Sequence, residues 1–284
     1  FAPLSAALPE IAREFSNNNN NIDFIIKLSF TIPSLAIIVT SPFYGILIDY
    51  TGRKKLLIFS LFLYGISGTI VIFITSIEEF IICRVISGIA LSGIMTTSTT
   101  LVGDNFSGIS RQRFMSHRGA FVNYSAVILN LIGGLLATFN WRTVFLVYII
   151  GLLMIPFTVK TIVSEKIKPN SIIKNKFNYK DKIPIMLLII GLLINMITNS
   201  AFFMILIQTP FLLKEINQFS PLLSGITTGT SAGAVATSSL LFLSFRKRIS
   251  ASMIFVLGFF LVFVGFLCLS QINFLSFIYP CIII

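Results

Sequence analysis

Apolar runs of about 20 residues recur along this chain, and short polar loops separate them. The runs occupy residues 24–47, 56–75, 80–102, 119–139, 143–163, 183–210, 221–245 and 250–270. A helix needs about 20 apolar residues to cross the hydrocarbon core of a bilayer. Hydrophobic residues make up 55% of the chain and charged residues only 11%. The pattern therefore predicts an all-α polytopic membrane protein.

The two ends of the sequence are also apolar. Residues 1–8 are interpreted as the end of a first span, and residues 273–284 as the start of a tenth. We expect the sequence to be a fragment that lacks most of span 1 and everything after early span 10, since it begins without Met and stops within an apolar run. Residues 9–23 contain five consecutive asparagines and predict a polar loop.

Basic residues gather in alternate loops. Four loops hold 16 of the 21 Lys and Arg residues, at positions 53–55, 111–118, 160–182 and 246–248. Because cytoplasmic loops are enriched in Lys and Arg, these loops are predicted to be cytoplasmic. We expect a multi-pass protein of the plasma membrane (the inner membrane of a bacterium), with a cytoplasmic N-terminus and central linker. The net charge of +11 is spread over separate loops, so nucleic-acid binding is not expected.

The arrangement of spans and basic loops repeats within the chain. A shift of 193 residues places residues 246–248 on residues 53–55, and the eighth and ninth spans on the second and third. The longest polar stretch lies between the copies. We therefore predict an N-terminal half at residues 1–163, a basic cytoplasmic linker at 164–182 and a C-terminal half at 183–284.

The loop after the second span has a distinctive sequence, G-I-L-I-D-Y-T-G-R-K-K, at residues 45–55. Gly52 permits the positive φ of a tight reversal, and Gly45 permits another helix to pass close by. Asp49 would lie at the C-terminal end of a helix, where the helix dipole disfavours negative charge. We expect Arg53 or the N-terminus of another helix to hold this carboxylate.

This loop resembles the signature G-x-L-a-D-r-x-G-r-k of the major facilitator superfamily. The matching residues are Gly45, Leu47, Asp49, Gly52, Arg53 and Lys54. The resemblance implies two pseudo-symmetric halves of six helices, here truncated, with a substrate site between them near the membrane midplane. It also implies that the loop is a conformational switch in which Asp49 acts as a latch.

Arg84 is the one charge well inside an apolar run. Insertion of Arg at a helix centre costs ~2.5–3.5 kcal/mol, so Arg84 should face a cavity or a partner rather than lipid. The sequence R-V-I-S-G from Arg84 to Gly88 resembles the span-4 motif R-x-x-q-G of drug:proton antiporters of the twelve-span type, with Ser87 in place of Gln. The resemblance implies a role in proton or substrate coupling. The alternative is an arginine that snorkels towards the headgroups.

The end of the fifth span resembles the same antiporters less completely. Gly133 and Gly134 match the last two residues of their motif G-P-x-x-G-G, and an Asn-Trp-Arg sequence follows at residues 140–142. Leu129 and Asn130 replace the Gly-Pro pair, which leaves the direction of transport open. The two glycines also suit close helix packing.

Other candidates for the substrate cavity are polar residues within the spans. They are Ser92 and Thr96 on the face of Arg84, Asn123 and Asn130 in span 5, and Asn195 and Asn199 in span 7. The asparagines are seven and four residues apart, so each pair shares a helix face. Such side chains either line the cavity or bond to neighbouring helices, and the spacing favours neither.

These features predict a secondary transporter, and a proton-coupled exporter best fits the resemblance. Its partners would be a small-molecule substrate, protons and the lipid bilayer, with no cofactor and no metal. The only histidine, His117, lies in a basic loop without a converging nucleophile and acid, so an enzyme is not expected. An uptake permease or symporter of the same fold is one alternative, and a non-transporting sensor or scaffold is another. No acid lies deep in a span, so a proton-carrying carboxylate is expected outside this sequence.

Overall fold

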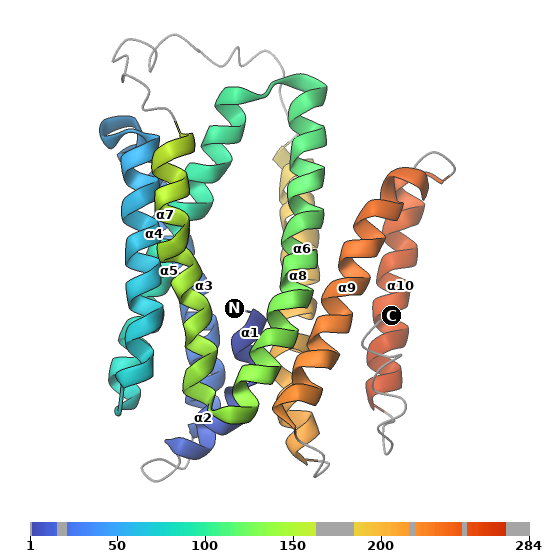
Figure 1. Cartoon of the computed structure of the whole chain (residues 1–284). Coiled ribbons are helices and arrows are strands. Elements are labelled where there is room, and N and C mark those ends of the chain that lie inside the picture. The colour runs from blue at the N-terminus through green and yellow to red at the C-terminus, as the bar shows by residue number, and fades with distance from the viewer. Residues whose placement is uncertain (1, 16–21, 163–184, 216–219, 246–248, 271–284) are drawn as a thin grey trace.

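The computed structural model describes residues 2–15, 22–162, 185–215, 220–245 and 249–270, which are almost entirely helical (Figure 1). In chain order the elements are α1 (Ala2–Ser5), α2 (Leu8–Glu14), α3 (Ile22–Thr51), α4 (Arg53–Thr69), the 3₁₀ helix η2 (Ile70–Phe73), α5 (Ile77–Asn105), α6 (Gly108–Phe139), the 3₁₀ helix η3 (Trp141–Tyr148), α7 (Ile149–Thr161), α8 (Ile185–Glu215), α9 (Pro221–Phe245) and α10 (Ala251–Ser270). The described part of the chain contains no strand. The predicted all-α fold is confirmed.

Within the described residues, six helical segments are long and apolar enough to cross a membrane. They are Ile22–Thr51, Arg53–Phe73, Ile77–Asn105, Gly108–Phe139, Trp141–Thr161 and Ile189–Lys214. They correspond to the predicted spans 2 to 7, and α9 and α10 occupy the positions of spans 8 and 9. The chain is therefore a multi-pass membrane protein.

Three predicted loops are shorter than expected because helices extend into them. α3 continues through Gly45 and Asp49, so the reversal before α4 is reduced to Gly52. The basic loop at residues 103–118 is helical from Gly108 onwards. The prediction of a polar loop at residues 9–23 was wrong in its first part, because Leu8–Glu14 form α2. Each extension pairs backbone groups within the chain, which is favourable close to a membrane.

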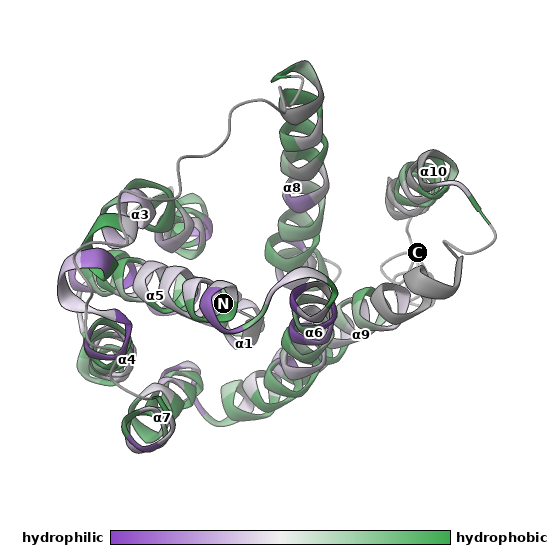
Figure 2. Ribbon diagram, turned by 90° about the horizontal axis from the view of Figure 1, so that it is seen from above, coloured by the Kyte–Doolittle hydropathy of each residue, from purple (hydrophilic) through white to green (hydrophobic). Residues whose placement is uncertain are grey.

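The helices up to α7 and those from α8 onwards form two groups, and α6 of the first group packs against α9 of the second. Seen from above, α3, α4, α5 and α7 lie together, whereas α6 lies beside α9 (Figure 2). The end of the bundle where α5 ends and α6 begins is uppermost in Figure 1. We call it the basic end, because α4 begins there with Arg53 and the start of α6 contributes Arg111. The other is the opposite end, and it contains η3 and α2. The division of the chain into two halves with a linker stays a prediction.

A hydrophobic cluster fills the opposite end of the bundle. Its members come from helices that are distant in the sequence, including Leu4, Leu8, Ile11, Ile26, Phe30, Val71, Phe80, Val144, Phe145 and Phe211. The Phe145 ring meets the Phe80 and Trp141 rings edge to face, with centroids 6.1 Å apart in both pairs. Because Phe211 belongs to α8, this cluster joins the N-terminal helices to those beyond the linker.

Glycines set the closest helix contacts. A Cβ added to Gly88 would lie 2.5 Å from the backbone oxygen of Pro33, so α5 and α3 touch at this point. A Cβ on Gly225 would lie 2.6 Å from the backbone oxygen of Asn130, where α9 touches α6. Only glycine allows helices to approach so closely. Gly88 lies one helical turn after Arg84, so this contact fixes the position of α5 relative to α3 close to Arg84.

Candidate functional site

The switch loop is built around Gly52. Its φ of +81° is in the left-handed region that glycine adopts without strain, and it reverses the chain between α3 and α4. The next two residues then contact other helices. Arg53 Nε pairs with Oδ2 of Asp104 at the end of α5, and Lys54 Nζ donates to the Val159 backbone oxygen in α7 at 2.7 Å. The loop therefore ties the basic ends of α4, α5 and α7 together.

Two residues of the loop differ from their predicted surroundings. Asp49 is exposed, and no cation among the described residues pairs with it. Arg53 pairs with Asp104 instead, because the helical extension to Thr51 lets α4 begin beside the end of α5. Gly45 is also exposed, and no described atom lies within 4 Å of the position of an added Cβ. The close helix contact predicted at Gly45 is thus absent from the described residues.

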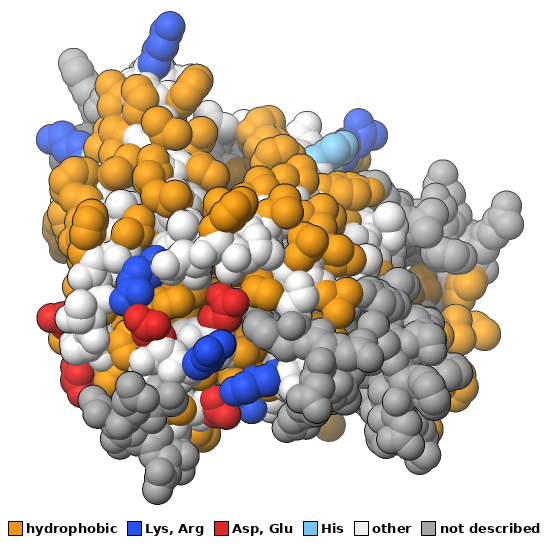
Figure 3. Space-filling model, turned by 60° about the horizontal axis from the view of Figure 1, so that its bottom comes forward, with side chains coloured by type: hydrophobic (Ala, Val, Ile, Leu, Met, Phe, Trp, Pro, Cys, Tyr) orange, Lys and Arg blue, Asp and Glu red, His pale blue; other side chains and the backbone are white. Residues whose placement is uncertain are grey.

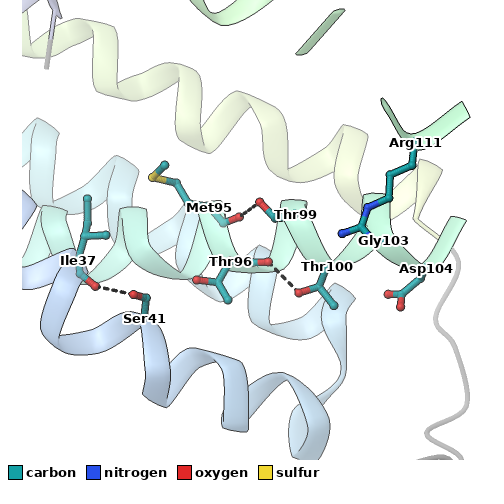
Figure 4. A pocket seen from close by; sticks show the side chains of 9 residues that line it. All are labelled: Ile37, Ser41, Met95, Thr96, Thr99, Thr100, Gly103, Asp104 and Arg111. Carbon is teal, nitrogen blue, oxygen red and sulfur yellow. Dashed lines mark hydrogen bonds between the residues drawn. The ribbon is translucent and has the colours of Figure 1, made fainter. Parts of the chain in front are cut away.

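A pocket of about 630 Å³ opens at the basic end (Figure 4). Asp104, which pairs with Arg53, is one of its lining residues. Its lining residues come from α3, α5 and the start of α6: Ile37, Ser41, Met95, Thr96, Thr99, Thr100, Gly103, Asp104 and Arg111. The Arg111 side chain reaches across to Gly103, where its Nη2 is 3.6 Å from the position of an added Cβ. Hydroxyls, one acid and one cation share this wall, which suits a polar or zwitterionic molecule.

Arg84 lies inside the hydrophobic cluster at the opposite end, not in this pocket. Its side chain is 1% exposed. The guanidinium carbon is 5.5, 5.0 and 5.2 Å from the ring centroids of Phe80, Phe145 and Tyr148, so aromatic faces surround the charge. Nη1 donates to the Tyr148 hydroxyl at 2.8 Å. Arg84 thus lies among protein side chains in the described structure, and its role in coupling stays a prediction.

Arg84 retains unused hydrogen-bonding capacity. Its Nε and Nη2 atoms are buried and have no hydrogen-bond partner among the described residues. No carboxylate of the described chain pairs with the guanidinium. Cation–π contacts offset part of the desolvation of a buried guanidinium, but an anion or water is needed to satisfy its remaining donors.

The other predicted cavity residues differ in their surroundings. Thr96 lines the pocket, and Ser92 is fully buried without a partner for its hydroxyl in the described chain. Asn123 Nδ2 donates to the Gly119 backbone oxygen in its own helix at 2.9 Å. Asn199 is exposed, and the side chain of Asn195 lies outside the described residues.

Asn130 stands out among these residues. It is 1% exposed, and neither atom of its amide has a partner among the described residues. It lies where α6 touches α9, because its backbone oxygen faces Gly225 and its Cβ would be 3.7 Å from an added Cβ on Gly229. Buried amides without partners are rare in proteins. The amide of Asn130 is therefore an unsatisfied polar group at the α6–α9 interface of the described structure.

Sequence reasoning missed two contacts between α3 and α8 at the opposite end. Lys214 Nζ of α8 lies 4.0 Å from Oδ1 of Asp23 in α3, and Lys27 Nζ lies 4.3 Å above the Phe211 ring. Figure 3 shows acidic and basic side chains gathered at this end, below a surface of hydrophobic side chains. The two pairs join residues 191 and 184 positions apart, so no local sequence pattern could have revealed them.

Further charged groups lie at the opposite end. Arg142 pairs with Glu14 at 3.2 Å and donates to the Ile74 backbone oxygen at 3.2 Å, which fixes η3 against α2 and η2. Glu10 is half-buried in α2, outside the six candidate spans. Burial raises the pKa of the Glu10 carboxyl, and the positive charge of Arg13 lowers it in part. Glu10 thus sits in a helix rather than in the expected polar loop.

A search against protein-family models matches residues 1–284 to the model described as Major Facilitator Superfamily. The fold is similar to the crystal structure of a D-xylose-proton symporter, with a TM-score of 0.71 and 16% identity, over 99% of this chain and 74% of that one. This likeness concerns the fold alone. The family match confirms the predicted family, and the structural likeness confirms the predicted fold.

This chain matches only part of the length of each curated relative. An uncharacterised MFS-type transporter, YdgK of Bacillus subtilis, is 25% identical over 83% of this chain and 60% of its own length. The quinolone resistance protein NorB of Staphylococcus aureus (strain Newman) is 27% identical, over 63% of this chain and 41% of its own. The vacuolar basic amino acid transporter 1 of Saccharomyces cerevisiae is 29% identical, over 48% and 23%. The chain thus spans about a quarter to three fifths of these relatives.

Proposed function

The chain belongs to the Major Facilitator Superfamily, and we propose that it acts as a secondary transporter which moves a small molecule across the membrane by alternating access. In this proposal the halves at residues 1–163 and 183–284 rock against each other, with the linker at 164–182 between them. The observation that carries the proposal is the buried guanidinium of Arg84, since charge within a membrane span marks a functional site by default.

We infer that this conformation is closed at the opposite end and open at the basic end. Contacts between the two proposed halves support the closure: the Asp23–Lys214 ion pair, the Lys27–Phe211 contact and the packing of Gly225 on α6. The pocket that contains Thr96 lies at the other end of the bundle. This combination is expected of one of the two states of an alternating-access cycle.

The switch loop is proposed to stabilise one state of that cycle. In this conformation Arg53 is paired with Asp104, both within the N-terminal half. The exposed carboxylate of Asp49 is then available to a cation or a helix N-terminus of the C-terminal half in the other state. Gly52 supplies the turn that holds both residues at the basic end, and Gly45 and Lys54 complete the motif.

Proton coupling is the finer part of the proposal. A permanent charge in a low-dielectric site is retained only where something offsets its desolvation. We infer that Arg84 pairs with a carboxylate during the cycle and that protonation of this group releases it. The substrate cavity would include Ser92, Thr96, Asn123, Asn130, Asn195 and Asn199.

Efflux across the bacterial plasma membrane is the direction we favour, because relatives include a quinolone resistance protein and multidrug resistance proteins. Uptake by symport is the second candidate, and a specific observation favours it: Leu129 and Asn130 replace the Gly-Pro pair of the antiporter motif. A sensor or scaffold without transport activity would have no evident need for a buried arginine.

Vesicle transport distinguishes these functions. The full-length protein that contains this chain is assayed in inverted and in right-side-out membrane vesicles with an imposed pH gradient. The probes are a fluoroquinolone, L-lysine and D-xylose, chosen from the relatives and the structural neighbour. Gradient-dependent uptake into inverted vesicles indicates efflux, and uptake into right-side-out vesicles indicates symport.

Arg84→Lys keeps the charge but loses the planar fork, so it is expected to lower coupled flux by about tenfold or more. Parental flux and an intact pH response in both Arg84→Lys and Arg84→Ala would refute proton coupling through Arg84.

A further inference from the structure

We propose that Tyr148 is a positioning residue, which orients the Arg84 guanidinium so that its two remaining donors face a single carboxylate. The inference deepens, and rests on, the coupling role proposed above for Arg84. Tyr148 closes the 3₁₀ helix η3, and its hydroxyl accepts from Nη1 of Arg84 at 2.8 Å. The sequence does not single out this residue, because the two partners are 64 positions apart.

The donors left on Arg84 form one edge of the guanidinium. Nε and Nη2 point in the same direction, and both are buried without a hydrogen-bond partner in the described part of the chain. Two parallel N–H groups match the two oxygens of a carboxylate. A guanidinium can bind a carboxylate through its end-on edge, formed by Nη1 and Nη2, or through its side-on edge, formed by Nε and Nη2. Because Nη1 donates to Tyr148, an anion at the end-on edge would have to displace the tyrosine. The side-on edge is the one that remains open.

Aromatic rings restrict how an anion can approach. Three ring centroids lie 5.0–5.5 Å from the guanidinium carbon, and all three rings belong to buried side chains. A cation held among aromatic faces is stabilised without neutralisation of its charge. An anion must then enter in the plane of the guanidinium, where only N–H donors are available. The orientation of that plane therefore decides whether binding occurs.

The local structure holds Tyr148 in one orientation. In a 3₁₀ helix residues i and i+3 lie on the same face, and the Phe145 and Tyr148 rings are accordingly stacked, with centroids 5.9 Å apart and planes 19° apart. The Tyr64 ring packs on Tyr148 at 4.8 Å. On α4, a Cβ added to Gly68 would lie 2.0 Å from Cγ of Tyr148. Gly68 thus leaves the space that the Tyr148 ring fills.

The carboxylate has two possible sources, the transported molecule or another part of the full-length protein. Two probes separate them, a fluoroquinolone, which carries a carboxylate, and ethidium, which has none. If the substrate supplies the carboxylate, loss of the Tyr148 hydroxyl slows fluoroquinolone transport alone. If the protein supplies it, transport of both probes is slowed, and the pH at half-maximal rate changes for both. Either pattern supports the positioning role.

Two variants test the role by different routes. Tyr148→Phe removes the hydroxyl and keeps the ring, whereas Gly68→Ala keeps the hydroxyl and displaces the ring. Gly191→Ala is the control, because open space surrounds Gly191. Rate, KM and pH profile are measured in vesicles with the full-length protein, at matched amounts of folded transporter. We expect both test variants to lower the maximal rate by about tenfold, as for loss of a hydrogen bond to a charged group, and the control to match the parent.

The outcomes separate this inference from the function on which it rests. If Arg84→Ala slows transport while Tyr148→Phe or Gly68→Ala matches the parent in rate, KM and pH profile, Tyr148 does not position Arg84, and the coupling role of Arg84 stands. If Arg84→Ala itself transports at the parental rate with an intact pH response, the coupling role is refuted, and the positioning role falls with it.

Discussion

Replacement of Gly225 by alanine tests whether the α6–α9 contact holds the opposite end closed. The new Cβ would lie 2.6 Å from the Asn130 backbone oxygen and 2.9 Å from Cα of Gly134. Both distances are shorter than real contacts of a Cβ atom, so the two helices must separate by several tenths of an ångström. Overpacking of this kind costs roughly 1–3 kcal/mol. The better helix propensity of alanine cancels, since α9 is helical in both states.

A penalty confined to the closed state shifts the conformational equilibrium towards opening. An energy of 1–3 kcal/mol corresponds to a shift of roughly 5- to 150-fold. The readout is thiol modification of Thr228→Cys in a background without the three native cysteines, because Thr228 is fully buried in α9. Gly225→Ala is expected to accelerate modification by a membrane-impermeant reagent within that range, and Gly191→Ala is expected to have no effect. An unchanged rate in the Gly225→Ala variant would show that this contact does not control the closure.

Three further predictions concern charged residues and topology. Reversal of the switch-loop ion pair, Arg53→Asp with Asp104→Arg, is expected to restore transport that either single change reduces by about tenfold; double variants no more active than the singles would exclude the pair. A single cysteine at Asn19 is expected to react with an impermeant reagent on intact cells, and one at Ser110 is not. Labelling of the cysteine at position 110 would show that the predicted topology is inverted. Since burial raises the pKa of the Glu10 carboxyl, ionisation of Glu10 destabilises the fold as the pH rises. Glu10→Gln should therefore raise the thermal midpoint at pH 7 but not at pH 4, and an equal gain at both pH values would contradict this.

Much of the fold could be predicted because the membrane restricts the chain to helices of a known length. The apolar runs located α3 to α10 to within a few residues at most ends. The largest errors occurred where polar residues continue a helix, at Asp49 and at Gly108, since periodicity and hydropathy do not report where a helix ends outside the hydrocarbon. Burial of Arg84 could be predicted for an equally general reason, the cost of exposing its charge to lipid.

The partners of the charged residues could not be predicted, because they depend on which helices meet. The sequence suggested Asp49 as a partner of Arg53, whereas the packing of α4 on α5 places Asp104 beside it. The aromatic rings around Arg84 come from α5 and η3, and the sequence gives no sign that Tyr148 is among them. Long-range geometry of this kind follows from the whole bundle and not from any local motif.

In the proposed function, the protein couples movement of a small molecule to a proton gradient. The most direct measurement uses the purified full-length protein in proteoliposomes that contain a pH-sensitive dye, with the fluoroquinolone, L-lysine or D-xylose added outside. We expect that an imposed pH gradient drives at least one probe against its own concentration gradient. Addition of this probe should change the internal pH, and Arg84→Ala should abolish both signals. Flux that is identical with and without the pH gradient, or no flux above that of protein-free liposomes for any of the probes, would contradict it.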